Sequence, residues 1–433
     1  MLVRAEAMST KIIHGECVAT MAGMEPESFH AVVTDPPAGI SFMNRAWDHD
    51  KGGRDEWIAW MQTVATEALR VCKPGAHALV WALPRTSHWT AMAWENAGWV
   101  VRDRLAHLFA SGFPKSLDVS KALDRAVGAE REVVGIKTRP DGTTRPNAGS
   151  WTPGTSQIYA QDKWTRKHMG IGSNKVDIPV TDAARQWEGW GTALKPACED
   201  WWVLRKPLSE PTVAANVFKH GTGGLNIDAC RVGVSKDVPA SSSSNKHVYS
   251  GNWGADRDGT SGFDQNIGRW PANVIHDGSP EVMDAFAKFG STQSVASDNR
   301  NGSDQGSVFS FDRKQDQLRG HTDSGTAARF FFTAKAASWE REGSHPTVKP
   351  QALMEWLLSL VTPPGGRVLD PFCGTGSTLV AADFLGFDAV GIEQDAKTCA
   401  DAENKIKRMP ARRMLGDDAK PAKVAEGQLG LFE

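Results

Sequence analysis

The sequence predicts an α/β fold with a doubly wound, mostly parallel sheet that two large loop-rich insertions interrupt. Short apolar runs typical of buried strands alternate with stretches of helical spacing, and this alternation favours a parallel sheet. Two of these runs stop at acid–proline turns, Asp35-Pro36-Pro37 and Asp370-Pro371. Because prolines cannot continue a strand ladder, both aspartates are expected at the carboxyl ends of strands, where open parallel sheets bind ligands.

The first part of the chain, residues 1–133, contains the clearest alternation of strands and helices. The stretch 55–70 places its large apolar residues at helical spacing, so we expect a helix that buries them in the core. These residues are Trp57, Trp60, Met61, Val64 and Ala68. The other elements expected here are strands at 12–17, 30–34, 77–81 and 99–105, a turn at Lys73-Pro74-Gly75 before the third strand, and a helix at 89–97.

The rest of the chain divides by composition into five further segments. Two segments are rich in Gly, Ser, Asn and other polar residues and read as insertions, although the second has an island of order near 269–275. Regular sheet is expected to resume after the first insertion, and a helix with one apolar face is expected after residue 350. The predicted segments are a loop-rich insertion at 134–191, sheet at 192–230, a second insertion at 231–326, a second sheet half at 327–410, and a flexible tail at 411–433.

The stretch RVLDPFCGTGST, residues 367–378, reads as strand, glycine turn and helix start, which together form a nucleotide-binding corner. A phosphate-binding NTPase loop needs a Lys that is absent here, and a dinucleotide fingerprint needs a third Gly where Leu379 stands. An acid, Glu393, ends the next apolar run and could accept bonds from ribose hydroxyls. S-adenosylmethionine is the commonest nucleoside cofactor without a pyrophosphate, and Asp370 could hold its ammonium group. A turn that only packs helix on strand is the alternative.

Composition excludes several other classes of protein. The formal net charge of −2 gives no global sign of nucleic-acid binding, so any DNA contact must come from a local patch. The six cysteines form no C-x-x-C pair, which argues against zinc and against a disulfide framework. No run is long enough to span a membrane, and no apolar signal core opens the chain. These features predict a cytoplasmic protein without a metal site.

Read together, the two acid–proline corners resemble the DNA amino-methyltransferases of phage and bacteria, which methylate N6 of adenine or N4 of cytosine. Shorter motifs that fit the same family are Gly15-Glu16-Cys17, Lys73-Pro74-Gly75, Ser111-Gly-Phe-Pro-Lys115, Ala193-Leu-Lys-Pro196, Gly221-Thr-Gly-Gly-Leu-Asn226 and His345-Pro-Thr-Val-Lys-Pro350. They stand in the permuted (β-type) order, with the target-base motif first and the cofactor motif last. The resemblance implies a methyltransferase sheet with the target-base half at 1–133 and the cofactor half at 327–410.

The resemblance also implies a set of site residues. Asp35 and the Pro36 carbonyl, with Pro37 and Ala38 in the same turn, would accept the two N–H bonds of an adenine amine, so that its lone pair points at the sulfonium methyl. The base must be flipped out of the duplex to reach them. The cofactor would be held by Glu16, Thr347, Lys349, Asp370, Pro371, Phe372, Gly374, Gly376, Ser377, Thr378 and Glu393.

Ala38 departs from the family pattern, which has an aromatic residue, usually Tyr, to stack on the flipped base. Neither Tyr can replace it by sequence position, although Phe42 or Phe372 could lean in. One lost stack corresponds to about 1–3 kcal/mol, so we expect a weakened or inactivated methyltransferase. An Asp at the first motif position favours N6-adenine. The alternatives are N4-cytosine methylation, a catalytically silent DNA-binding relative, and an RNA or small-molecule methyltransferase.

Contacts with macromolecules are expected from three places in the chain. Basic residues on the loops are candidates for phosphate contacts: Lys115, Arg166, Lys167 and Arg269. Target recognition is expected from the second insertion or, failing that, the first. The tail ends in Gln428-Leu-Gly-Leu-Phe432, which resembles the peptide that docks bacterial replication proteins on the sliding clamp, with packing back onto the core as the alternative.

Overall fold

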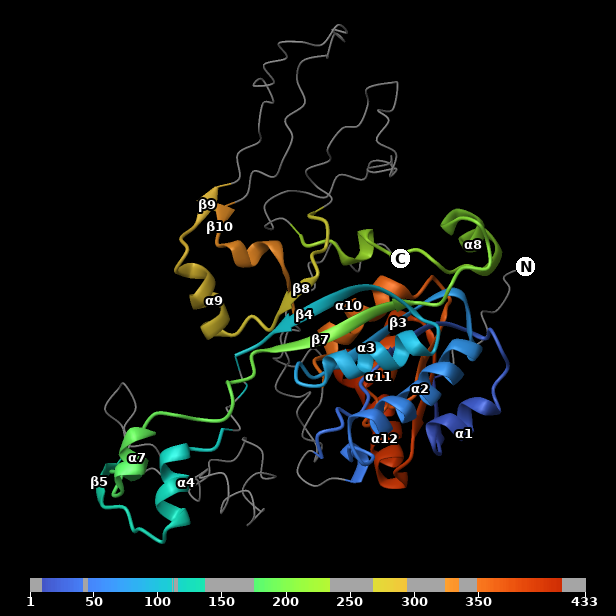
Figure 1. Ribbon diagram of the computed structural model, residues 1–433. Helices are drawn as coiled ribbons and strands as arrows, with labels where there is room; N and C mark the ends of the chain where they lie inside the picture. The colour runs from blue at the N-terminus through green and yellow to red at the C-terminus, as the bar shows by residue number, and fades with distance from the viewer. Residues whose placement is uncertain are drawn as a thin grey trace, which may run out of the picture.

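The computed structural model describes residues 10–41, 46–110, 112, 116–136, 175–233, 268–293, 324–334 and 349–414, with side chains described as far as residue 408. A nine-stranded sheet forms its centre (Figure 1). The strands, in spatial order, are β1 (Thr10–His14), β13 (Asp388–Glu393), β12 (Arg367–Asp370), β2 (Phe29–Thr34), β3 (Cys72–Ala82), β7 (Cys198–Arg205), β4 (Val100–Leu108), β8 (Val274–His276) and β11 (Phe332–Thr333). Within this sheet β7 runs antiparallel to both neighbours, and the other pairings are parallel. The predicted mostly parallel α/β fold is confirmed.

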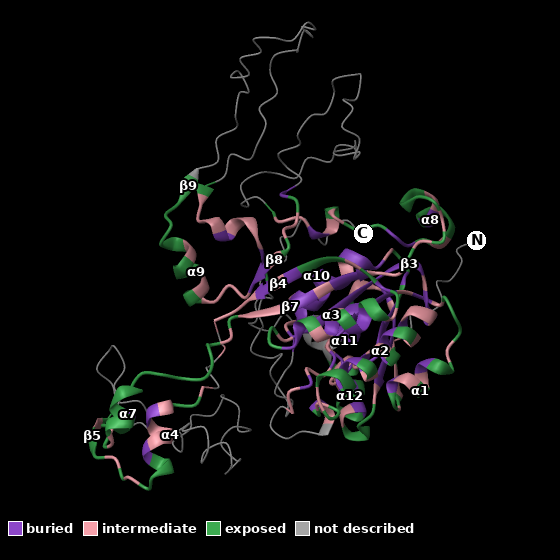
Figure 2. Ribbon diagram, in the orientation of Figure 1, coloured by how far each residue is buried: buried purple, intermediate pink, exposed green. Residues whose placement is uncertain are grey.

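Helices cover both faces of the sheet, because successive strand residues point to opposite sides. Along β2, Ala31 and Val33 face one apolar cluster and Val32 faces the other. The second cluster is completed by α1 (Cys17–Ala22), α2 (Arg54–Val71) and α3 (Ser87–Asn96), and the first by α10 (Gln351–Val361) and α11 (Ser377–Leu385), over which α12 (Ala396–Met414) packs. In Figure 2 the central strands and α10 are largely buried.

Several predicted elements are confirmed with small shifts, and three predictions are wrong. The helix predicted at 55–70 is α2, and its Trp57 is fully buried. The predicted turn at Lys73 lies inside β3, where Gly75 takes a φ of +82° and the pairing with β2 shifts register. Sheet does not continue to Asn226 after β7, because α8 (Val213–His220) follows. Helix α10 is buried on nearly all sides rather than on one face, since it lies in the core.

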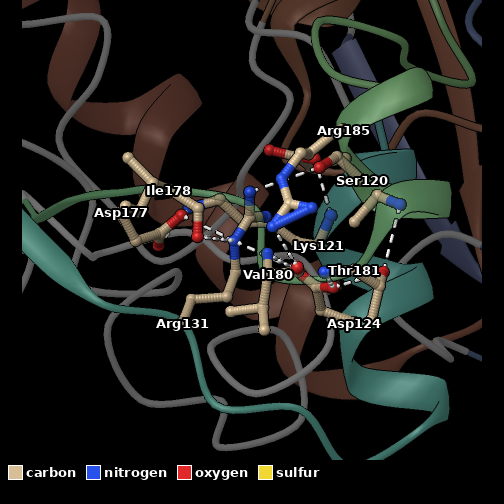
Figure 3. A network of polar contacts seen from close by, with 11 residues as sticks. Ser120, Lys121, Asp124, Arg131, Asp177, Ile178, Val180, Thr181 and Arg185 are labelled. Carbon is tan, nitrogen blue, oxygen red and sulfur yellow. Dashed lines mark hydrogen bonds and ion pairs between the residues drawn. The ribbon is translucent and has the colours of Figure 1, made fainter.

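A small lobe projects from one end of the sheet, on the lower left of Figure 1. It consists of α4 (Val119–Ala126), α7 (Asp182–Gln186), β5 (Val133–Ile136) and β6 (Lys175–Asp177). Its centre is polar: the buried Asp124 carboxylate accepts bonds from Val180 N and from Thr181, and it lies 3.4 Å from Arg131 Nε (Figure 3). The lobe therefore begins before the predicted boundary at 134, which cuts through β5.

The second predicted insertion contributes to the main sheet. Strand β8 pairs with β4 and β11, so the predicted island of order is part of the central sheet. The other elements described in this region are α9 (Pro280–Ala287), β9 (Thr292–Gln293), β10 (Ser324–Gly325) and the short helix η4 (Ala327–Phe330). The predicted clamp peptide, 428–432, lies outside the described residues. Within the described ranges, no helix has the length and apolarity needed to cross a membrane.

Candidate active site at the carboxyl edge of the sheet

The two acid–proline corners lie side by side in the structure, as the sequence predicted. Strands β2 and β12 are adjacent and parallel, so their carboxyl ends meet at one edge of the sheet. Thr34, the last residue of β2, donates a hydrogen bond from Oγ1 to Asp370 Oδ1 at 2.6 Å, and both residues are buried. This bond joins the backbone that carries Asp35 to the first acid of the glycine corner.

The glycine corner leaves room for a ligand at one glycine and packs tightly at the other. Gly376 is the N-cap residue of α11 and has a φ of +79°, and a Cβ placed there would lie 3.2 Å from the Ala402 Cβ on α12. Gly374 has a φ of +50°, and a Cβ there would meet no atom within 4 Å. Gly391 on β13 takes the packing role of the missing third glycine, because a Cβ there would come within 2.7 Å of the Cys373 Cβ. The open side at Gly374 is therefore the part of the corner that a nucleoside can approach.

Asp370 is a buried carboxyl whose pKa is raised. Its side chain also accepts bonds from the Phe372 amide, at 3.1 Å, and from Thr378. Burial raises the pKa of Asp370 to about 6, although these hydrogen bonds and that from Thr34 lower it; the nearby Asp35 charge adds to the rise. A cationic group beside Asp370 would favour its ionised form.

Two further predicted cofactor residues lie near each other, Glu393 at the end of β13 and Glu16 two residues after β1. Glu393 ends β13, where burial raises the pKa of its carboxyl and Asp395 N donates to Oε1 at 2.8 Å. His14 pairs with Glu393 in register, which brings Glu16 close to this strand end. Glu16 caps α1 by accepting a bond from Ala19 N at 2.8 Å.

Asp35 sits directly after β2 and pairs with Lys349, a residue that the sequence assigned to the cofactor. Lys349 Nζ lies 2.9 Å from Asp35 Oδ2 and 3.9 Å from Glu199 Oε2, and it stands 4.0 Å above the Trp81 ring. Burial raises the pKa of Asp35, whereas the Lys349 charge opposes that rise. Glu199 and Trp81 were missed by the sequence analysis. The direction of β7 explains the first omission: because β7 is antiparallel, its beginning rather than its end meets this edge.

The turn that follows Asp35 is fixed by hydrogen bonds to its backbone. Thr86 Oγ1 donates to the Ala38 carbonyl at 2.8 Å, and the Gly39 amide donates to Asp48 Oδ1 at 2.9 Å. The Ala38 side chain packs against the core cluster. Of the two rings considered as substitutes for the missing aromatic, Phe372 has its centroid 5.9 Å from that of Trp60, and Phe42 lies outside the described residues.

The remaining predicted site residues are placed as follows. Pro36 and Pro371 are buried and Pro37 is half-buried, while Ser377 accepts a bond from Lys405 Nζ at 3.1 Å. Arg269 is buried and stands over the Phe330 ring, and its contact with DNA phosphate stays a prediction. No cluster of three potential metal ligands occurs in the part of the chain that the structure describes. Outside that part lie Lys115, Arg166, Lys167 and Thr347.

The bond between Thr34 and Asp370 is open to a direct test. Thr34→Val removes one hydrogen bond from a buried carboxylate, so we expect it to lower the free energy of unfolding at pH 7.5 by about 1–3 kcal/mol. Thr34→Ser retains the hydroxyl and is the matched control. Urea unfolding of the three proteins measures the difference. Equal stability of Thr34→Val and the parent would show that this bond contributes nothing.

Known proteins resemble parts of this chain. Residues 227–404 match the family model N6_N4_Mtase, described as DNA methylase. Type II methyltransferase M2.DpnII of Streptococcus pneumoniae is 36% identical over 75 residues, which are 17% of this chain and 27% of that protein. Type II methyltransferase M.HinfI of Haemophilus influenzae is 34% identical over 98 residues, 21% of this chain and 27% of the relative. The chain thus matches about a quarter of the length of these curated relatives.

Solved structures give a match of lower similarity over most of the chain. The PvuII DNA methyltransferase, described as cytosine-N4-specific, aligns with a TM-score of 0.40 and 13% identity, covering 95% of this chain and 94% of that one. TTHA0409 of Thermus thermophilus, described as a putative DNA modification methylase complexed with S-adenosyl-L-methionine, aligns with a TM-score of 0.38 and 13% identity, covering 92% and 94%.

Proposed function

We propose that this protein is a DNA methyltransferase of the N6/N4 amine family that transfers a methyl group from S-adenosylmethionine to N6 of adenine in duplex DNA. The observation that carries the proposal is the pair of corners at adjacent strand ends, joined by the bond between Thr34 and Asp370. One corner has the features of a nucleoside site, and the other presents a carboxylate for an amine. The family match over residues 227–404 supports methylation of DNA.

The cofactor is S-adenosylmethionine, bound at the glycine corner. Asp370 holds its ammonium group, Glu393 accepts bonds from the ribose hydroxyls, and the open side of Gly374 lets the cofactor approach the backbone. The cofactor strands β12 and β13 come last in the sequence but lie between β1 and β2 in the sheet. This placement supports the permuted order of the β-type enzymes.

The target amine is held at the Asp35–Pro36 corner, which the bond between Thr34 and Asp370 joins to the glycine corner. Asp35 and the Pro36 carbonyl each accept one N–H bond, which lets the nitrogen pyramidalise and direct its lone pair at the sulfonium methyl. The enzyme contributes positioning and electrostatic stabilisation, without a covalent intermediate. Because the amine is unreachable inside a duplex, the adenine is flipped into this site. Asp rather than Ser at position 35 favours adenine over cytosine.

Target recognition belongs, in this proposal, to the insertion at 231–326, with phosphate contacts supplying salt-dependent affinity. Docking of Gln428–Phe432 on a sliding clamp stays a prediction. The reaction itself is tested by incubating the purified protein with tritiated S-adenosylmethionine and mixed-sequence duplex DNA, then counting the label in precipitated DNA. Label that depends on Asp35 supports the proposal, and no label with the protein or with its Ala38→Tyr variant contradicts it.

Because Ala38 stands where the family has an aromatic residue, we predict that the protein transfers methyl groups more slowly than a variant with a ring at this position would. Ala38→Tyr restores a ring beside the flipped base, so we expect single-turnover methyl transfer to rise at least about tenfold, the low end of one base–aromatic stack. Affinity for S-adenosylmethionine should stay the same, since the glycine corner is untouched. Ala38→Leu, which adds bulk without a ring, is the control. Equal transfer rates for the parent and Ala38→Tyr would mean that another ring already stacks on the base.

A further inference from the structure

Lys349 is a buried cation in the half of the site that faces the target amine. Its side chain is 9% exposed, and the residue lies two positions before the start of α10. The ammonium group is enclosed by two carboxylates and an aromatic face: Asp35 Oδ2 at 2.9 Å, Glu199 Oε2 at 3.9 Å and the Trp81 ring at 4.0 Å. A buried ammonium needs such compensation, because removing it from water is costly.

We propose that Lys349 is a positioning residue for methyl transfer, whose ammonium group is the counter-ion that holds the Asp35 carboxylate charged and aimed at the target amine. Glu199 and Trp81 hold that ammonium group in place. The inference rests on the proposed function. It gives Lys349 a role at the base-binding corner, rather than the cofactor contact that the family resemblance implies.

The surroundings of Asp35 explain why it needs a counter-ion. Burial is the largest effect that disfavours the ionised form of Asp35, and the charges of Glu199 and Asp48 act in the same direction. Lys349 opposes these effects by its charge and by its hydrogen bond. Without the ammonium group, Asp35 would take up a proton more readily, and a protonated carboxyl is a poorer acceptor for the amine hydrogens.

The geometry also leaves one carboxylate oxygen of Asp35 available to the target amine. Lys349 engages Oδ2, and among the described residues Oδ1 has no hydrogen-bond partner. The amine of a flipped base can therefore bond to Oδ1 while Lys349 stays in place. Beyond Glu199, His107 is buried with no partner for either ring nitrogen in the described part of the chain, and burial lowers its pKa. A neutral imidazole there leaves Lys349 as the cation that balances the two carboxylates.

The direct test is a pH titration of the Asp35 carboxyl, monitored by carbon-13 NMR. The protein is labelled at the aspartate carboxyl carbons, and the Asp35 signal is assigned as the one that the Asp35→Asn variant lacks. Lys349→Met should raise the pKa of Asp35 by at least about one unit, since an adjacent opposite charge shifts a carboxyl by about 1–3 units. Lys349→Arg should largely retain the parent value, and Lys407→Met on the exposed face of α12 should not change it. An unchanged Asp35 titration in Lys349→Met would overturn the proposal.

A second variant, Glu199→Gln, should shift the pKa of Asp35 in the opposite direction. It keeps the test decisive if Lys349→Met does not fold. The Glu199 charge raises the pKa of Asp35, so Glu199→Gln should lower it, and a rise would contradict the arrangement. In methyl transfer, activity falls as Asp35 becomes protonated, so the acid limb of the pH–rate profile should move to higher pH in Lys349→Met. If the pKa of Asp35 shifts as expected but no variant transfers a methyl group, the proposed function alone is refuted. If methyl transfer occurs but the pKa of Asp35 is the same in all variants, the role of Lys349 is refuted.

Discussion

Asp35→Ala is expected to lower single-turnover methyl transfer at least about 100-fold, the loss typical of one preorganised electrostatic contact. The carboxylate lies directly after β2, and in the proposed mechanism it accepts a bond that the amine must donate before its nitrogen can act as a nucleophile. Affinity for S-adenosylmethionine should change little, because the proposed cofactor site is the glycine corner. The loss should be clearest in the Ala38→Tyr background, where Asp35→Ala should also remove the gain.

The control is Asp55→Ala on α2, whose carboxylate is 80% exposed. Asp35→Ala leaves the Lys349 ammonium without its nearest partner, so the cofactor affinity of the variant serves as the check that it is folded. Calorimetry and the tritium assay on the same preparation supply both values. Retention of more than about a tenth of the parent rate would remove Asp35 from the mechanism.

Asp370→Ala is expected to abolish measurable binding of S-adenosylmethionine, which corresponds to a loss of about a hundredfold or more for a buried charge pair with one partner removed. The control is Asp401→Ala, an exposed carboxyl on α12. Binding should also depend on pH in a defined direction. The pKa of free Asp370 is raised to about 6, and only the ionised form attracts the ammonium group. Affinity should therefore be constant above about pH 7 and fall by up to about tenfold per unit below pH 6.

Isothermal calorimetry across pH 5 to 8 measures this dependence, with both variants titrated beside the parent. The raised pKa belongs to the free protein, so binding at pH 6 should be accompanied by proton release, detectable as a dependence of the heat on the buffer used. Full affinity in Asp370→Ala, or affinity that rises as the pH falls, would place the cofactor elsewhere.

The parts of the structure that the sequence predicted share one property. Each is encoded by a pattern within a short stretch of neighbouring residues. Asp35 and Asp370 each stop an apolar run at a proline, and parallel strands bring such ends to one edge whatever connects them. The spacing in α2 predicted its buried Trp57 for the same reason. The fold class, and the meeting of these two acids at one edge of the sheet, could therefore be predicted from the sequence.

The features that the sequence analysis missed depend on which strands lie beside each other. Glu199 joins the site because β7 runs antiparallel between β3 and β4, and nothing in its own residues encodes that direction. The contact between Lys349 and Asp35 spans most of the chain, so no periodicity could predict it. Gly391 serves in place of a third glycine in the loop because β13 packs against Cys373.

Nucleoside mass spectrometry most directly tests the proposed transfer of a methyl group to the amine of adenine in DNA. DNA would be digested from a host without amine methylation of its own, expressing the parent protein, its Ala38→Tyr variant or Asp35→Ala. We predict N6-methyladenine with the parent, more of it with Ala38→Tyr, and none with Asp35→Ala. N4-methylcytosine in its place, or no methylated amine even with Ala38→Tyr, would contradict the claim.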